Sequence, residues 1–156
     1  MDCGGLELPV AVFGSMVRHA EREGAREAVG LLAGELRRGR AVARQAVPLE
    51  SLGGTRFFLV DPYSQFLGER FVHQQGQEII GVYHSHPGGA ATLSQLDRAL
   101  AAPWTCAHLI MAPDDVAPDT WLVRGWVHSA GGMRQVPIDI TQAGGACHQE
   151  PAPPRS

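Results

Sequence analysis

Two histidines separated by a single residue carry the strongest chemical signal in this chain. They stand in the run His84-Ser85-His86-Pro87, directly after the apolar segment Glu78-Ile79-Ile80-Gly81-Val82-Tyr83. Because this segment is β-branched and a Pro-Gly-Gly break follows it, we predict a buried strand that ends at about His86. Residues two apart on a strand share a face. The two imidazoles should therefore point the same way and could bind one ion.

A carboxylate follows within reach of this histidine pair. The run Ser94-Gln95-Leu96-Asp97 begins a helix-prone stretch, and a glycine-rich loop between the two motifs could fold Asp97 back towards the strand. Two histidine nitrogens and one carboxylate oxygen suit Zn²⁺, and three protein ligands leave a fourth position for water. The pattern predicts a catalytic zinc site formed by His84, His86 and Asp97.

Each half of this pattern also has an ordinary explanation. Ser-x-x-Asp at the start of a helix is usually a capping box, in which both side chains satisfy backbone N–H groups. A histidine pair on a surface strand usually binds nothing. The two halves follow one buried strand and are separated by one short loop, and this combination favours the metal site.

A zinc hydrolase also needs a base, and the upstream carboxylate Glu27 immediately precedes an apolar run. A lone glutamate is usually only a solvated side chain, so its position relative to the other residues decides its role. Taken together, the residues resemble the motif of the JAMM (MPN+) zinc metalloproteases: Glu27 with Gly30-Leu31-Leu32-Ala33-Gly34, then His84-Ser85-His86-Pro87, Ser94 and Asp97.

The resemblance covers about residues 6–140 and implies both a fold and a set of roles. The implied fold is a single α/β domain with a mixed β-sheet flanked by helices, related to cytidine deaminases. The resemblance implies zinc ligation by His84, His86 and Asp97, with Glu27 as general acid/base and Ser94 as hydroxyl donor to the oxyanion. Two loop positions that are often proline in the family are Ala25 and Leu93 here, which bears on loop rigidity and substrate preference more than on metal binding.

The resemblance implies a zinc-dependent peptidase or isopeptidase, similar to deubiquitinases. Its expected partner is a ubiquitin-like or sulfur-carrier protein, cleaved after a Gly-Gly C-terminus. The connections from Pro48 to Phe57 and from the Ser94 helix to Cys106 are short, and they leave no room for the long insertions of the eukaryotic enzymes. The segment Ser51 to Leu59 is a candidate edge strand that would accept an extended tail by strand addition.

Three other classes share parts of the pattern. A non-catalytic MPN scaffold could retain zinc without peptidase activity. A DNA-repair-associated RadC-like protein has similar motifs, but this chain has no basic helix-hairpin-helix segment. A zinc deaminase would need Pro-Cys-x-x-Cys ligands, which are absent.

Composition indicates a small cytoplasmic protein. We expect one domain over residues 1–140 and a disordered tail over residues 141–156, whose composition cannot build a core. No apolar run is long enough for a bilayer, and the N-terminus lacks a signal-peptide pattern. The net charge of −3 gives no reason to expect nucleic acid. The sequence leaves a homodimer open.

Periodicity and turn residues predict the elements that must position the site. Helices are expected over residues 12–23 and 62–73, and from Ser94 onwards. Tyr63, Phe66, Leu67 and Phe71 should form the buried stripe of the second helix. Besides the metal strand, strands are expected near residues 6–8, 28–36, 41–48, 57–60, 106–111, 120–128 and 133–140.

Overall fold

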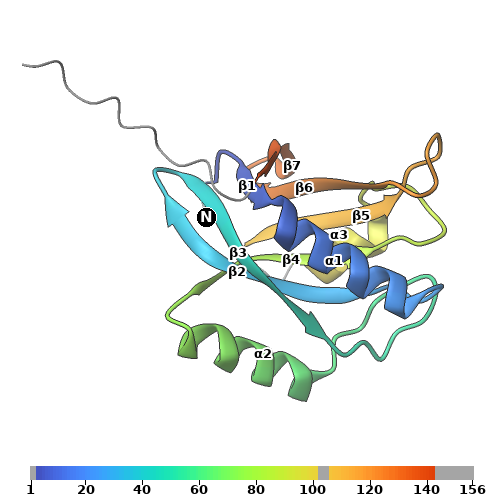
Figure 1. Cartoon of the computed structure of the whole chain (residues 1–156), viewed down its shortest axis with the longest axis horizontal. Helices are drawn as coiled ribbons and strands as arrows, with labels where there is room; N and C mark the ends of the chain where they lie inside the picture. Colours follow the sequence, from blue (N-terminus) through green and yellow to red (C-terminus); the bar gives the residue numbers. More distant parts are fainter. Residues whose placement is uncertain (1–2, 102–105, 143–156) are drawn as a thin grey trace, which may run out of the picture.

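The described part of the chain folds into one eight-stranded mixed sheet with three helices (Figure 1). The computed structural model describes residues 3–101 and 106–142. In chain order the elements are β1 (Leu6–Pro9), α1 (Val10–Glu23), β2 (Val29–Arg37), β3 (Arg40–Leu49), α2 (Pro62–Gln74), β4 (Glu78–Ser85), α3 (Gln95–Ala101), β5 (Ala107–Pro113), β6 (Trp121–Ser129), β7 (Gly132–Val136) and β8 (Ile138–Thr141).

Strand β4, which carries the histidine motif, lies in the middle of the sheet. The strand order is β7-β6-β5-β4-β2-β3-β1-β8, so β2 and β5 flank β4. The pairs β4–β5, β1–β3 and β1–β8 are parallel and the others are antiparallel. The predicted α/β domain with a mixed sheet is confirmed.

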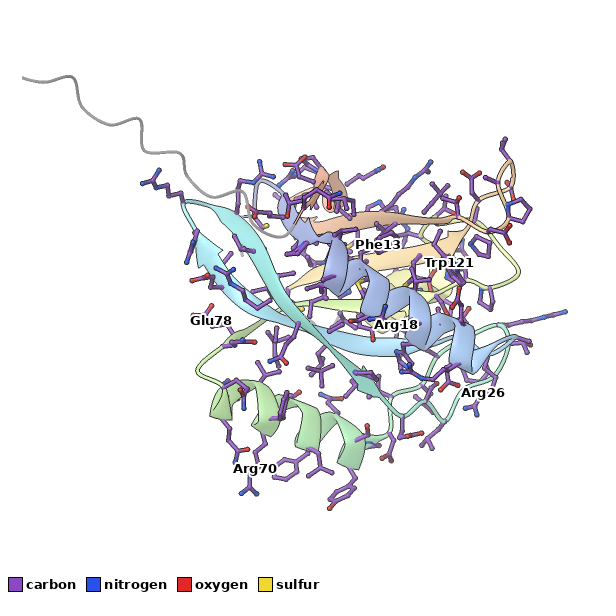
Figure 2. The ribbon with its side chains drawn as sticks, in the orientation of Figure 1. Phe13, Arg18, Arg26, Arg70, Glu78 and Trp121 are labelled. Carbon is purple, nitrogen blue, oxygen red and sulfur yellow. The ribbon has the colours of Figure 1, made fainter. Side chains whose placement is uncertain are left out.

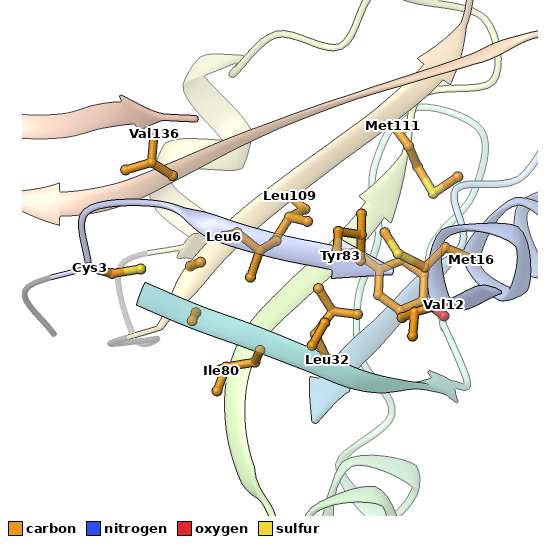
Figure 3. Packing of buried hydrophobic residues seen from close by; sticks show 14 of the residues in the cluster. Cys3, Leu6, Val12, Met16, Leu32, Ile80, Tyr83, Leu109, Met111 and Val136 are labelled. Atoms are coloured by element: carbon orange, nitrogen blue, oxygen red, sulfur yellow. The ribbon is translucent and has the colours of Figure 1, made fainter. Parts of the chain in front are cut away.

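The sheet separates two apolar cores. Helix α1 packs Val12 and Met16 against Leu32 and Tyr83 on one face (Figure 3). On the other face, α2 packs against β3 and β4, around a cluster that contains Leu31 and residues of β3 and β4. Most of the predicted α1 face is buried, as expected for an amphipathic helix that covers a sheet.

A β-bulge decides which face carries the first histidine. The β2–β4 register shifts between Leu32 and Ala33. Ile80 and Tyr83, three residues apart, consequently both lie in the α1 core, whereas Val82 lies in the cluster on the opposite face. Residue alternation beyond the bulge places His84 on the same face as Val82.

The predicted strand at residues 57–60 is wrong, and so is the predicted edge strand from Ser51 to Leu59. Only an isolated bridge joins Ser51 to Val60. Between them the chain closes on itself, because the Leu52 N–H donates to Leu59 O at 2.6 Å. A Cβ on Gly53 would lie 2.4 Å from Phe57 O, so the turn needs glycine there. We call residues 51–60 the bracket loop.

The predicted strand at residues 133–140 is two strands. They are separated at Pro137, which has no N–H to donate to a ladder. Strand β7 pairs with β6, while β8 pairs with β1 at the opposite edge of the sheet. A local apolar pattern could not show that one short segment serves both edges.

Helix α2 occurs where predicted, but its predicted buried stripe is wrong. Tyr63, Phe66, Leu67 and Phe71 are 42–68% exposed, and the buried residues are Gly68 and Val72. A Cβ on Gly68 would lie 2.8 Å from Leu49 Cδ2. The helix therefore approaches the sheet closely through its small residues, which turns the large ones outward.

Two remaining expectations concern the C-terminal tail and membrane-spanning segments. Residues 143–156 of the predicted disordered tail lie outside the described residues, whereas Thr141 ends β8. None of the helices in the described part has the length and apolar content that a bilayer crossing requires.

Candidate active site

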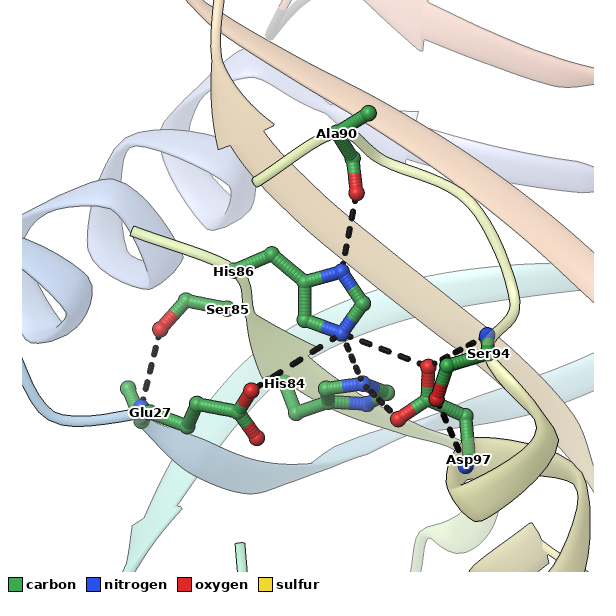
Figure 4. A network of polar contacts seen from close by, with 8 residues as sticks. Glu27, His84, Ser85, His86, Ala90, Ser94 and Asp97 are labelled. Atoms are coloured by element: carbon green, nitrogen blue, oxygen red, sulfur yellow. Dashed lines mark hydrogen bonds and ion pairs between the residues drawn. The ribbon is translucent and has the colours of Figure 1, made fainter. Parts of the chain in front are cut away.

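The two motif histidines converge at the carboxyl end of β4. His84 is the second-last residue of β4. Just beyond the strand, the His86 N–H continues the pairing with β5 by donating to Met111 O at 2.8 Å. Their Nε2 atoms are 3.1 Å apart (Figure 4). The predicted convergence of two imidazoles at the end of a buried strand is therefore present.

Asp97 lies in the first turn of α3, and its carboxylate faces both imidazoles. Asp97 Oδ1 is 3.0 Å from His84 Nε2, and Oδ2 is 3.3 Å from His86 Nε2. The side chain is buried. The loop between β4 and α3 thus folds back as its glycines suggested, and it brings the three predicted ligands together.

The capping box is also present, and it uses the same carboxylate. The Ser94 N–H donates to Asp97 Oδ2 at 2.8 Å, and the Asp97 N–H donates to Ser94 Oγ at 3.0 Å. The ordinary and the chemical interpretations of Ser-x-x-Asp are therefore not exclusive. Ser94 Oγ acts as an acceptor in the cap, so its own hydroxyl proton remains to be donated elsewhere.

Glu27 faces the histidines from the segment that leads into β2. Its Oε1 lies 4.0 Å from His86 Nε2, and its buried Oε2 has no hydrogen-bond partner among the described residues. The backbone around it is fixed: the Ala28 N–H donates to Ser85 Oγ at 2.8 Å, and the Glu27 N–H donates to Gly54 O at 3.1 Å. Ser85 and the bracket loop hold this carboxylate at the site.

The two carboxylates have opposite electrostatic character. Burial raises the pKa of Glu27 to about 7, only partly offset by the nearby His86. Burial also acts to raise the pKa of Asp97, but hydrogen bonds with His84 and His86 outweigh it and hold that pKa well below its usual range. Asp97 is therefore a permanent anion, whereas Glu27 can gain or lose a proton near neutral pH.

The donor atoms of His84, His86 and Asp97 fit a zinc ion. Two nitrogens bound to one tetrahedral zinc lie about 3.3 Å apart, close to the observed separation of the imidazoles. Glu27 also lies within reach of the same point, because one donor atom each from Glu27, His84 and His86 lies within 4.8 Å of the others, but the direct contacts of both imidazoles are with Asp97. His86 Nδ1–H donates to Ala90 O at 2.8 Å, so that in the neutral imidazole the Nε2 lone pair is directed at the site.

Sequence reasoning missed two residues that support the site. Phe58 is buried, and its ring centroid lies 4.6 Å from that of His84 with the planes tilted by 37°. Ser85, within the histidine motif, links β4 to the backbone beside Glu27. For Phe58 the available sequence signal was the Gly53-Gly54 pair, because it marks a turn that returns the chain over the site.

The position that departs from the family pattern before Ser94 has its own explanation. Leu93 packs against a buried cluster that includes Ala91, Ile110 and Trp126. Hydrophobic packing therefore anchors the loop at a position where the family often has proline.

An open cleft of about 400 Å³ gives access to the polar cluster. Its walls come from the bracket loop, from the segment that leads into β2, and from the two ends of the loop that joins β4 to α3. The lining residues are Glu27, Thr55, Arg56, His86, Pro87, Gly88, Gly89 and Ser94. Both residues expected to perform chemistry, Glu27 and Ser94, line this cleft.

Comparison with known families matches residues 9–128 to the prokaryotic homologs of the JAB domain. The chain belongs to this family. A probable TtuB-protein conjugate cleaving protease from Thermus thermophilus is 28% identical over 113 residues, which cover 71% of this chain and 72% of that protein. The resemblance to JAMM/MPN+ proteins is confirmed, and the family together with this relative supports a peptidase of the JAB type.

A solved structure agrees on the fold. Protein DSY2949 from Desulfitobacterium hafniense, whose solution structure is known, superposes with a TM-score of 0.78. It is 24% identical, and the match covers 88% of this chain and 93% of that one. This likeness supports the overall fold of the mixed sheet and its helices.

Proposed function

We propose that this JAB protein is a zinc-dependent peptidase or isopeptidase that cleaves after the Gly-Gly C-terminus of a ubiquitin-like or sulfur-carrier protein. One observation carries the proposal. Two histidines and an ionised Asp97 meet at one point, and a second carboxylate with a raised pKa lies beside them and lines an open cleft.

In this proposal His84, His86 and Asp97 hold the zinc ion. When bound, zinc supplies a Lewis acid that polarises a carbonyl and lowers the pKa of a coordinated water towards 7. A permanently charged Asp97 suits ligation, because no proton competes for its oxygens near neutral pH. Its bond to the Ser94 N–H fixes the orientation of the carboxylate.

Glu27 acts as the general acid/base. Its pKa of about 7 lets it accept a proton from the attacking water and then donate that proton to the leaving amine at neutral pH. Its Oε2, which no described residue engages in a hydrogen bond, is the atom available for this transfer. Ser94 donates its hydroxyl proton to the developing oxyanion, and one such donor typically contributes about 3 kcal/mol to transition-state stabilisation.

The substrate assignment rests on the relative and on the shape of the cleft. The Thermus thermophilus relative is named for cleaving TtuB-protein conjugates. In this chain Pro87, Gly88 and Gly89 form one wall of the cleft and Thr55 and Arg56 another. An extended Gly-Gly segment has no side chains to accommodate between these walls.

The test is metal analysis together with cleavage of Gly-Gly-terminated carriers fused to a reporter. We expect about one zinc per chain and release of the reporter, both lost after treatment with a zinc chelator and restored by zinc. A matched fusion with the Gly-Gly pair replaced by Ala-Ala should be cleaved much more slowly. Bound zinc without cleavage of any carrier from the same genome would instead indicate a non-catalytic scaffold.

A further inference from the structure

The outward face of α2 is a large apolar surface that the proposed peptidase chemistry does not use. It consists of Tyr63, Phe66, Leu67 and Phe71, which we call the α2 stripe. Beside it lies a groove of about 430 Å³ between α2 and β3, whose lining includes Val47 and Pro48. Contiguous exposed apolar surface rimmed by polar residues marks interaction sites in soluble proteins.

We propose that the α2 stripe is the interface of a two-fold symmetric homodimer, in which the α2 helices of two copies pack antiparallel. A two-fold interface places the same surface on both copies, so that surface must be complementary to itself. Tyr63, Leu67 and Phe71 are spaced four residues apart along one side of the helix. With the axis at Leu67, Tyr63 of each copy meets Phe71 of the other.

The charges around the stripe are arranged as this pairing requires. Glu50 and Asp61 lie at the N-terminal end of α2, where the Glu50 N–H donates to Ser64 Oγ and the Asp61 side chain caps the helix. Arg70 and His73 are exposed towards the C-terminal end. Figure 2 shows Arg70 projecting from α2 on the side away from the sheet. Antiparallel packing brings the basic end of one helix beside the acidic end of the other.

The remaining acid of this helix does not oppose the pairing. Glu69 is half-buried, and its Oε1 already accepts from Gln65 Nε2 at 2.8 Å. It is therefore engaged within its own helix.

The available area is consistent with a reversible dimer. Large side chains cover about 150–250 Å² each, so four that are half exposed supply on the order of 400 Å² per copy. A standard stable interface buries about 800 Å² per partner. The groove floor and the flanking charged residues supply further area, so we expect a small interface and a weak, reversible dimer.

Sedimentation velocity of the full chain over a range of concentrations tests this interface. We expect wild type to dimerise and Leu67→Glu, which places two carboxylates at the two-fold axis, to raise the dissociation constant at least about tenfold. Leu122→Glu is the matched control. Leu122 lies on β6 and is 41% exposed, against 44% for Leu67, and its substitution should leave the dimer unchanged.

A charge exchange tests the orientation of the helices. Arg70→Glu should weaken the dimer, and adding Glu50→Arg to the same chain should restore it. A wild-type chain that stays monomeric throughout the micromolar range would overturn the proposal, as would a dimer unaffected by Leu67→Glu. A monomer whose Leu67→Glu variant instead loses affinity for a carrier protein would assign the stripe to the substrate.

Discussion

The two carboxylates beside the histidine pair, Asp97 and Glu27, are of the same chemical kind but are held in opposite states. On the β4–α3 side, Asp97 is fully engaged by two imidazoles and a backbone N–H. On the β2 side, Glu27 is equally buried, yet one of its oxygens has no partner among the described residues. Hydrogen bonding rather than burial therefore separates an anion suited to hold a metal from a carboxylate suited to carry a proton.

Removing a histidine should abolish metal binding on the β4–α3 side of the site. His84→Ala deletes the imidazole between Asp97 and the apolar wall formed by Phe58, so we expect loss of both bound zinc and cleavage. Metal analysis and the reporter assay on the same preparation check this. His108→Ala, which removes a buried histidine of β5 outside the ligand set, serves as the control and should retain both.

Ser94 tests whether the start of α3 does more than cap a helix. Ser94→Ala removes both the cap acceptor and the proposed oxyanion donor, and we expect kcat to fall about 100-fold with zinc retained. Ser94→Asp keeps a capping side chain without a hydroxyl proton. If Ser94→Asp restored activity, the serine would have only the structural role.

Phe58 tests the support that the bracket loop gives to the ligand side. Phe58→Ala leaves His84 without its ring contact, and we expect zinc affinity, measured by competition with a chelator, to fall about tenfold. Phe57→Ala changes the neighbouring exposed ring and should have little effect. Equal losses in both variants would point to general damage to the loop.

Glu27 makes a prediction about stability with zinc removed. Its folded pKa of about 7 exceeds its ordinary value of 4.5, so wild type loses stability relative to Glu27→Gln as pH rises from about 4.5 to 7. Thermal unfolding in chelator should therefore show Glu27→Gln to be more stable by roughly 2 kcal/mol at pH 8, with the difference shrinking towards pH 4.5. A difference independent of pH would contradict the burial of a titrating carboxyl.

The same pKa sets the direction of the activity profile. Glu27 must be ionised to accept a proton, so kcat/KM should rise as pH increases through the pKa of this group. Replacing Glu27 should remove this rise of kcat/KM with pH together with the activity. The profile of Phe58→Ala should keep it, because Phe58 exchanges no proton.

The spatial arrangement of the motif side chains was predictable because its signals are local. The spacing of His84 and His86 on an apolar strand, and of Ser94 and Asp97 at a helix start, fixes geometry over a few residues. Glu27 needed the family resemblance, since nothing nearby in sequence distinguishes it from a solvated glutamate. Its position beside the histidines follows from β2 pairing with β4, which is a long-range event.

The errors in the predicted fold all concern which segment an apolar face or run packs against or pairs with. The stripe of α2 has the period of a buried face, yet Gly68 brings the opposite side of the helix onto Leu49. The apolar run at residues 57–60 has strand composition, but it closes onto Leu52 instead of joining the sheet. Periodicity identifies an apolar face without identifying what covers it, and Pro137 shows the same limit for strand pairing.

Removing the charge of each carboxylate in turn tests the central claim most directly. Zinc content and Gly-Gly fusion cleavage would be measured side by side for Asp97→Asn and Glu27→Gln, two nearly isosteric changes that both keep an amide oxygen as acceptor. We predict that Asp97→Asn loses zinc and activity together, whereas Glu27→Gln keeps about one zinc per chain and loses cleavage. Zinc lost from Glu27→Gln and retained by Asp97→Asn would contradict the division of roles between the two carboxylates.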